Sequence, residues 1–144
     1  MKRRTLLQAL PAAALLPASL WAASRNFEAA NDATSVFELR VYHAAAGKLG
    51  DLEARFRDHT IKIFERHGMK SVAYWAPLDE PEKSSTLIYI LQHPSREAAA
   101  ANWKSFQDDP EWKSVKEKSE ANGKLVDKVD STFMALTDFS PRLT

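Results

Sequence analysis

Hydrophobic residues recur along this chain with two different periods, and the two periods alternate in blocks. Four segments are rich in β-branched and aromatic side chains, which predicts strands at residues 36–43, 71–77, 86–93 and about 129–138. Two other segments carry apolar residues at helical spacing, which predicts helices over residues 47–67 and from Ser95 to Asn122. The predicted order is β-α-β-β-α-β. This is an α+β, ferredoxin-like fold, a four-stranded antiparallel sheet with both helices on one face.

Capping residues mark where the predicted helices begin and end. Gly68 follows the first helix and suits the left-handed conformation that commonly terminates a helix. Ser95 is a favourable N-cap for the second helix. Asp109 and Pro110 form another start signal, because Asp is a good N-cap and Pro is tolerated at the first helical position. We therefore expect the second helix to restart there and to end near Gly123.

The first 24 residues follow the order of an export signal. Positive charge at Lys2, Arg3 and Arg4 precedes an apolar run over residues 6–20, and small residues at 22–24 close the segment. The paired arginines resemble a twin-arginine signal, which directs folded proteins to export. At roughly 15 residues, the run is short for the ~20 that span a bilayer, so we expect no stable membrane span after signal removal.

This leader sets the expected organisation of the chain. We predict a signal peptide at residues 1–24, a flexible polar tether at 25–34 and a single folded domain at 35–141. The mature protein is then expected to be periplasmic or secreted. The leader holds three of the 20 basic residues and none of the 19 acidic ones, so the remainder carries a net charge of about −2. Such a balance gives no electrostatic drive toward nucleic acid, which we exclude as a partner.

Composition also removes several kinds of chemistry. The chain has no cysteine, which excludes disulfides, thiolate nucleophiles, cysteine-ligated zinc and iron–sulfur clusters. It has four glycines, too few to favour a nucleotide-binding loop, and no Ser-His-Asp order or paired-carboxylate motif stands out. The sequence therefore predicts no metal site and names neither a cofactor nor a catalytic set.

The strand patterns indicate a second apolar sheet face that two helices cannot cover. Tyr74 and Trp75 are adjacent, so one large ring lies on each face, and Ile88 and Ile90 point away from the side of Tyr89. At ~25 cal/mol per Å2, leaving such residues exposed forfeits several kcal/mol and creates an adhesive patch. We therefore predict a homodimer that covers this face. The alternatives are cover by the tether, or an apolar surface that is simply tolerated.

Polar and aromatic strand residues are the first candidates for a binding site. Glu38, Arg40 and Tyr42 share one side of the first strand, which we expect to be the open face of the sheet. Enclosed by a dimer, they would orient a small polar or aromatic ligand, or pair with one another or with the partner chain. Three rings of the next two strands are further candidates, with ordinary packing as the alternative: Tyr74, Trp75 and Tyr89.

His59 is the candidate with the most specific chemistry. With Phe56 and Ile63 it falls at helical spacing on the side of the first helix expected to face the sheet. There it would serve as a general base or an axial ligand, or else as a core-edge histidine bonded to a strand. His43 and His93 end the first and third strands, and we expect these strand ends to lie together and bring the two histidines close. Such a pair is an indication of a metal site, but no carboxylate pattern supports one.

Several segments together resemble the NIPSNAP family of the dimeric α+β barrel superfamily. They are FELRVY (37–42), RFRDHTIKIFERHGM (55–69), YWAP (74–77), WKSFQDDPEW (103–112) and SEANG (119–123). The resemblance implies a ferredoxin-like fold and a two-chain barrel, but no particular reaction. We therefore expect an exported homodimer that binds a small ligand or a partner. The alternative, by analogy with related barrels, is a small cofactor-free monooxygenase or a haem-handling enzyme.

Overall fold

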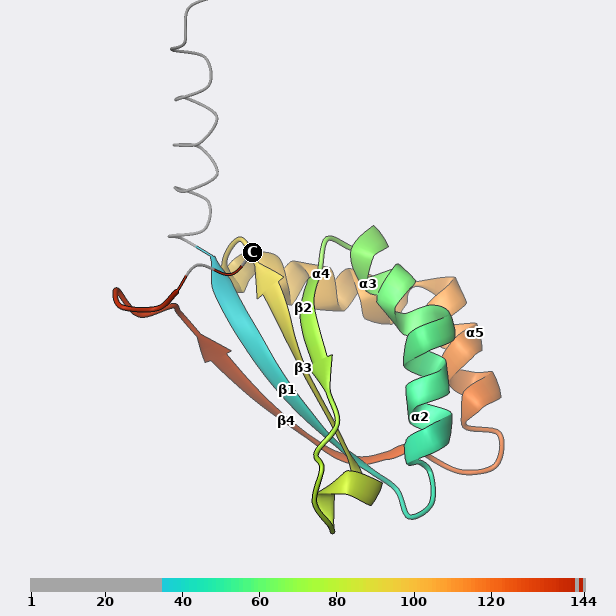
Figure 1. The fold of residues 1–144 in the computed structure, drawn as a ribbon. Coiled ribbons are helices and arrows are strands. Elements are labelled where there is room, and N and C mark those ends of the chain that lie inside the picture. The colour runs from blue at the N-terminus through green and yellow to red at the C-terminus, as the bar shows by residue number, and fades with distance from the viewer. Residues whose placement is uncertain (1–34, 142, 144) are drawn as a thin grey trace, which may run out of the picture.

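The computed structural model describes residues 35–141 and 143, and there the predicted ferredoxin-like α+β fold is confirmed (Figure 1). Both the predicted signal peptide (1–24) and the predicted tether (25–34) lie outside the described residues. The four strands are β1 (Val36–Ala44), β2 (Lys70–Trp75), β3 (Thr86–His93) and β4 (Val126–Met134). They form one antiparallel sheet in the order β2-β3-β1-β4, so β1 and β3 occupy its centre.

The helices all lie on one face of this sheet (Figure 1). The first predicted helix is built from three consecutive pieces, α2 (Leu49–Arg55), the π-helical turn η1 (Phe56–Thr60) and α3 (Ile61–Arg66). The second is α4 (Arg96–Asp108) followed by α5 (Pro110–Ser119), and a short 3-10 turn, η2 (Glu82–Ser84), lies between β2 and β3. Within the described residues, none of these helices has the length and apolar character that a membrane crossing requires.

The predicted caps are confirmed. Ser95 Oγ accepts a hydrogen bond from the Ala98 N–H at 3.0 Å and so begins α4. Asp109 caps α5 in the same way, with Pro110 as its first residue. Gly68 follows α3 with a φ of 73°, the left-handed conformation that glycine adopts without strain.

The last strand begins earlier than the predicted 129–138. It pairs with β1 from Val126 opposite Ala44 to Met134 opposite Phe37. Because β1 begins one residue before Phe37, the chain beyond Met134 has almost no strand left to pair with. The length of β1 therefore determines where β4 ends, which its own sequence does not reveal.

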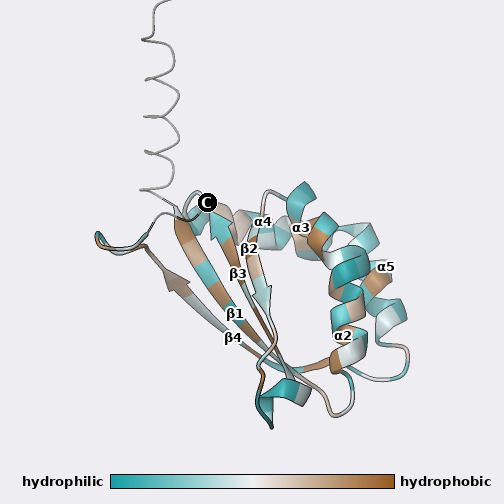
Figure 2. Cartoon of the chain, viewed as in Figure 1, coloured by the Kyte–Doolittle hydropathy of each residue, from teal (hydrophilic) through white to brown (hydrophobic). Residues whose placement is uncertain are grey.

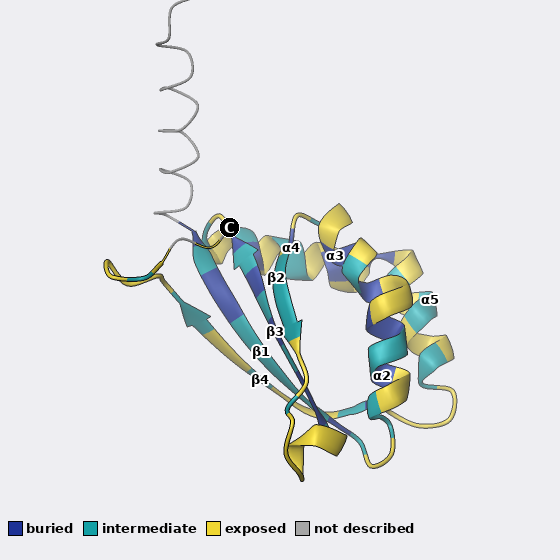
Figure 3. Ribbon diagram, in the orientation of Figure 1, coloured by how far each residue is buried: buried dark blue, intermediate teal, exposed yellow. Residues whose placement is uncertain are grey.

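The core fills the layer between the sheet and the helices. Buried residues concentrate on the central strands and on the sides of α2 and α3 that face them (Figure 3). Along β1, hydrophobic and hydrophilic residues alternate (Figure 2). The main buried cluster draws residues from both the sheet and the helices: Ala44, Leu52, Phe56, Ile63, Phe64, Met69, Leu87, Tyr89, Leu91, Phe106 and Leu125.

Candidate functional site

Cross-strand pairing shows which face of the sheet each candidate occupies. Arg40 lies opposite Tyr89, and Tyr89 is fully buried beneath the helices. Residues directly opposite in neighbouring strands share a face, so Glu38, Arg40 and Tyr42 face the helices. The expectation that these three lie on the open face was therefore wrong. Alternation alone separates the two sides of a strand, but does not say which side the helices cover.

Glu38 is the polar centre of the layer between the sheet and the helices. It is 1% exposed and accepts four hydrogen bonds, from Arg40 Nη1 (2.8 Å), His93 Nε2 (3.1 Å), Trp103 Nε1 (2.7 Å) and Ser131 Oγ (2.7 Å). Burial by itself would raise the pKa of Glu38, but these donors outweigh it and lower that pKa to about 2. Glu38 is therefore an ionised acceptor whose capacity is already used.

Beside Glu38, a row of polar groups extends along the same face. The guanidinium of Arg40 lies over the Trp103 ring, 4.4 Å from its centroid, and Arg40 Nη2 donates to the Tyr42 hydroxyl at 3.4 Å. Tyr89 lies next in the row, with its ring centroid 5.3 Å from that of Tyr42. Within the described residues, the Tyr89 hydroxyl and Arg40 Nε make no hydrogen bond of ordinary length and angle, although Tyr42 and Arg40 lie close enough to Tyr89 to affect the pKa of its hydroxyl.

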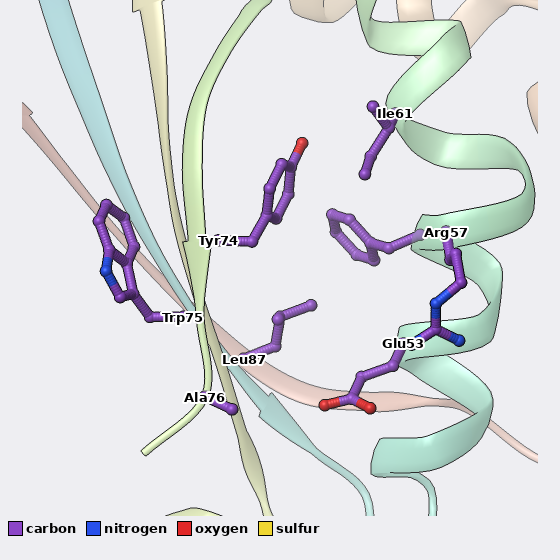
Figure 4. Close-up of a pocket in the computed structure, with 8 residues that line it drawn as sticks. Glu53, Arg57, Ile61, Tyr74, Trp75, Ala76 and Leu87 are labelled. Carbon is purple, nitrogen blue, oxygen red and sulfur yellow. The ribbon is translucent and has the colours of Figure 1, made fainter. Parts of the chain in front are cut away.

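A pocket of about 310 Å3 opens between β2 and the continuous helix formed by α2, η1 and α3 (Figure 4). Its apolar wall includes Phe56, Ile61, Tyr74 and Leu87, while Glu53 and Arg57 of the helix flank it. Tyr74 and Leu87 extend from the strands toward the helix, and Ile61 extends back from the helix (Figure 4). The arrangement suits a small, largely apolar molecule with charged groups at its edge.

The three aromatic candidates have different places around this pocket. Tyr74 lines it, and its hydroxyl shares a hydrogen bond of 2.8 Å with Ser71 Oγ. Trp75 belongs to the rim, but its ring projects from the other face of β2 and is 46% exposed (Figure 4). Tyr89 stands behind the pocket, stacked on Tyr74 with ring centroids 5.4 Å apart. The prediction that Tyr74 and Trp75 lie on opposite faces is confirmed.

His59 does not face the sheet, contrary to expectation. It is exposed, and Thr60 takes the inward position, where its hydroxyl donates to the Arg55 carbonyl at 3.2 Å. The π turn is the reason. Leu52, Phe56, Thr60 and Phe64 are four residues apart, and a regular α-helix would rotate each about 40° past the last. One wider turn absorbs this drift, so all four remain buried.

His59 instead borders a second, more polar groove between α2, η1 and α5, of about 450 Å3. Arg55 at this groove is only 6% exposed, although arginine side chains are rarely buried in proteins. Its Nη1 donates to Ser119 Oγ at 3.3 Å and to Glu120 Oε1 at 3.1 Å, and its guanidinium lies over the Trp112 ring. An arginine side chain can be buried where an aromatic ring and a carboxylate from another part of the fold contact it. The spacing of residues within one helix cannot predict such contacts.

The other histidines have structural partners. His67 Nε2 donates to Asp109 Oδ2 at 2.6 Å and so links the end of α3 to the cap of α5. His43 and His93 are at opposite ends of the antiparallel β1–β3 pair, because His43 lies opposite Thr86. The suggestion that they share an end was therefore wrong. Among the described residues, no cluster of His, Asp and Glu side chains could hold a metal ion.

The comparisons with known proteins agree with this fold. Solved structures of two bacterial relatives, neither with an assigned function, superpose on most of the chain. An uncharacterised NIPSNAP-like domain protein from Burkholderia xenovorans gives a TM-score of 0.66 at 17% identity, over 78% of this chain and 93% of that one. A NIPSNAP family protein of unknown function from Agrobacterium tumefaciens gives 0.65 at 20% identity, over 78% and 96%.

A more distant match is a monooxygenase from Streptomyces coelicolor in complex with the ligand nanaomycin D, with a TM-score of 0.50 at 16% identity, over 76% of this chain and 93% of that one. At these identities the likeness shows the fold alone. No curated protein matches the sequence. The NIPSNAP family, however, matches residues 37–141, nearly the whole described domain. The chain belongs to the NIPSNAP family.

Proposed function

We propose that this protein is an exported homodimer that binds a small, flat, largely apolar ligand between β2 and the α2–η1–α3 helix. The observation that carries the proposal is the pocket lined by Phe56, Ile61, Tyr74 and Leu87. Its volume of about 310 Å3 lies at the lower end of the range for small-molecule sites, ~300–1,000 Å3. Two aromatic walls favour a ring that stacks or packs edge to face.

The unshielded sheet face supports the homodimer. Leu39 lies opposite Ile90 and Val41 opposite Ile88, all on the face away from the helices. Trp75, 46% exposed, extends the same surface along β2. A second copy of the chain presents the same strands and the same side chains, so the two faces are complementary in chemistry without any further partner.

The leader supports export. Arg3 and Arg4, the apolar run over residues 6–20 and the small residues after it have the composition and order of a signal peptide. Replacing both arginines by lysine keeps the charge but removes the pair that a twin-arginine translocon reads. The variant is expected to remain in the cytoplasmic fraction of a bacterial host, and its normal appearance in the periplasm would contradict the twin-arginine route.

The haem alternative depended on His59 as an axial ligand facing the sheet. His59 borders the groove next to α5 and does not line the pocket, so it cannot be the axial ligand of a haem bound there. We therefore do not propose haem binding.

Calorimetric titration with naphthalene-2-carboxylate tests the proposed pocket. Wild type is expected to bind this probe. Ile61→Trp, which fills the pocket from a half-buried helix position, is expected to abolish binding. The matched control is Val115→Trp, which fills the other groove and should bind as wild type does. Normal binding by Ile61→Trp, or loss of binding in Val115→Trp alone, would overturn the assignment.

A further inference from the structure

Two buried polar atoms behind the pocket have no partner in the described part of the chain, namely the Tyr89 hydroxyl and Arg40 Nε. Buried polar groups are nearly always hydrogen-bonded, so each exception calls for an explanation. His93 Nδ1, on the ring that donates to Glu38, also has no partner there, whereas Tyr74 and Glu38 are satisfied. Tyr74 bonds Ser71, and Glu38 has four donors. The first two atoms belong to residues that lie directly opposite each other in the β1–β3 pair, so their side chains are neighbours on the same face of the sheet.

Arg40 contributes donors alone, whereas each tyrosine hydroxyl can both donate and accept. Arg40 has no acceptor atom, and its Nε–H is unused. Tyr42 accepts from Arg40 and keeps its own proton for donation. Burial, and then the nearby Tyr42, raise the pKa of Tyr89 well above its ordinary value, so its hydroxyl keeps its proton. Because Glu38 already accepts four hydrogen bonds and an N–H can only donate, the partner that Arg40 Nε lacks is a further acceptor, which would also accept from the Tyr89 hydroxyl.

The donor group lies one ring behind the pocket. Phe56 and Tyr74 line the pocket, and both contact Tyr89, at ring centroid distances of 5.2 Å and 5.4 Å. Phe56 also contacts Tyr42 at 5.6 Å, so its ring screens both hydroxyl-bearing rings from the pocket. Phe56 is the first residue of the π turn, where the helix departs from its regular hydrogen bonding. A rotation of the Phe56 ring would be required to join the pocket to the donors.

We propose that Tyr89, Tyr42 and Arg40 form the recognition end of the pocket, and that its ligand is a flat aromatic molecule bearing a carboxylate or another anionic oxygen. This proposal rests on the proposed function and names its ligand class. The aromatic part occupies the pocket between Ile61 and Tyr74, and the oxygen takes the hydrogen bonds that are unused in the empty protein. A cationic head would be repelled by the Arg40 guanidinium there, so the site discriminates between the two kinds of head.

Two probes with the same ring and opposite heads test the proposal, naphthalene-2-carboxylate and 2-naphthylmethylammonium. Wild type is expected to bind the carboxylate at least about tenfold more tightly, as one hydrogen bond to a charged group provides. Tyr89→Phe removes only the unpartnered hydroxyl. It is expected to weaken carboxylate binding by about tenfold, to leave ammonium binding unchanged, and not to lower the thermal midpoint without probe.

Thr60→Val is the control, because it removes a buried hydroxyl outside the pocket lining that already has the Arg55 carbonyl as a partner. It should keep the preference for the carboxylate and lose a little stability. Tyr42→Phe removes the other tyrosine hydroxyl of the proposed recognition end and should also weaken carboxylate binding.

Equal affinity for the two probes, or an unchanged preference in Tyr89→Phe, would overturn this inference. If both probes still bind and Ile61→Trp still blocks them, the proposed pocket stands without its acceptor preference. If neither probe binds, the pocket and its recognition end are both wrong.

Discussion

Glu38 is a buried carboxylate that satisfies donors from β1, β3, α4 and β4 at once. Replacing it by an amide keeps the shape but leaves Arg40 without its counter-ion. We expect Glu38→Gln to lose about 3–5 kcal/mol of unfolding free energy in urea titrations, because a buried charge is left unpaired. The control is Glu111→Gln, which removes an exposed partner of Arg66 and should cost less than about 1 kcal/mol. Similar losses in both variants would contradict the role of Glu38.

The same carboxylate predicts a pH dependence. Its pKa is lowered from 4.5 to about 2 in the folded protein, so its stabilisation is present above pH 4.5 and is lost as the pH falls toward 2. A shift of this size corresponds to roughly 3 kcal/mol. Wild type should therefore lose stability faster than Glu38→Gln across this window, measured by urea unfolding at several pH values. Parallel profiles would show that Glu38 is not responsible.

His59 and Thr60 illustrate what a single helix pattern can and cannot provide. A uniform period of 3.6 places His59 inward, and nothing in its own residue type argues against that position. The buried set Leu52, Phe56, Thr60 and Phe64 was visible in the sequence as a run of fours, but it requires a π turn to stay on one face. Such a turn is rare, and the regular helix is the better prior expectation.

The helix ends were predictable because their signals are local. Asp109 combines two tasks in one side chain. Its Oδ1 accepts from the Glu111 and Trp112 N–H groups, and its Oδ2 accepts from Arg66 and His67 at the end of α3. The capping role of Asp109 could be predicted from the sequence, because Pro110 follows it directly. The link to α3 could not, because it depends on how the two helices are placed in space.

Asp109→Ala removes both tasks. We expect it to cost about 1–3 kcal/mol in thermal or urea unfolding, with the cap contributing ~0.5–2 kcal/mol. Asp109→Asn keeps a capping oxygen and should fall between wild type and alanine. The neighbouring Asp108 is exposed and pairs with Lys104, which is also exposed, so Asp108→Ala is the control and should stay within about 0.5 kcal/mol of wild type. A loss as large in Asp108→Ala would refute the assignment.

The order and type of the elements could be predicted from the sequence, because periods of two and 3.6 residues, caps and turn residues all agree along the chain. The site could be predicted only in part. Its candidate residues were found, but Glu38, Arg40 and Tyr42 were placed on the wrong face. Both faces of β3 are apolar, with Tyr89 on one and Ile88 and Ile90 on the other. Hydropathy therefore cannot say which face the helices cover.

The open face predicts the assembly. Wild type is expected to sediment at twice the chain mass in analytical ultracentrifugation. Ile90→Glu, which places a charge on the half-buried face opposite Leu39, is expected to sediment as a single chain with an unchanged circular dichroism spectrum. Lys104→Glu on the exposed side of α4 is the control and should remain dimeric. A stable single copy of wild type at high concentration would contradict the homodimer.

The most direct measurement is the structure of the full chain bound to naphthalene-2-carboxylate. The account predicts the ring between Ile61 and Tyr74, with Phe56 turned aside and the carboxylate within hydrogen-bonding distance of Tyr89. A ring in the groove bordered by His59 and Val115, or a protein that remains empty at saturating probe, would contradict it.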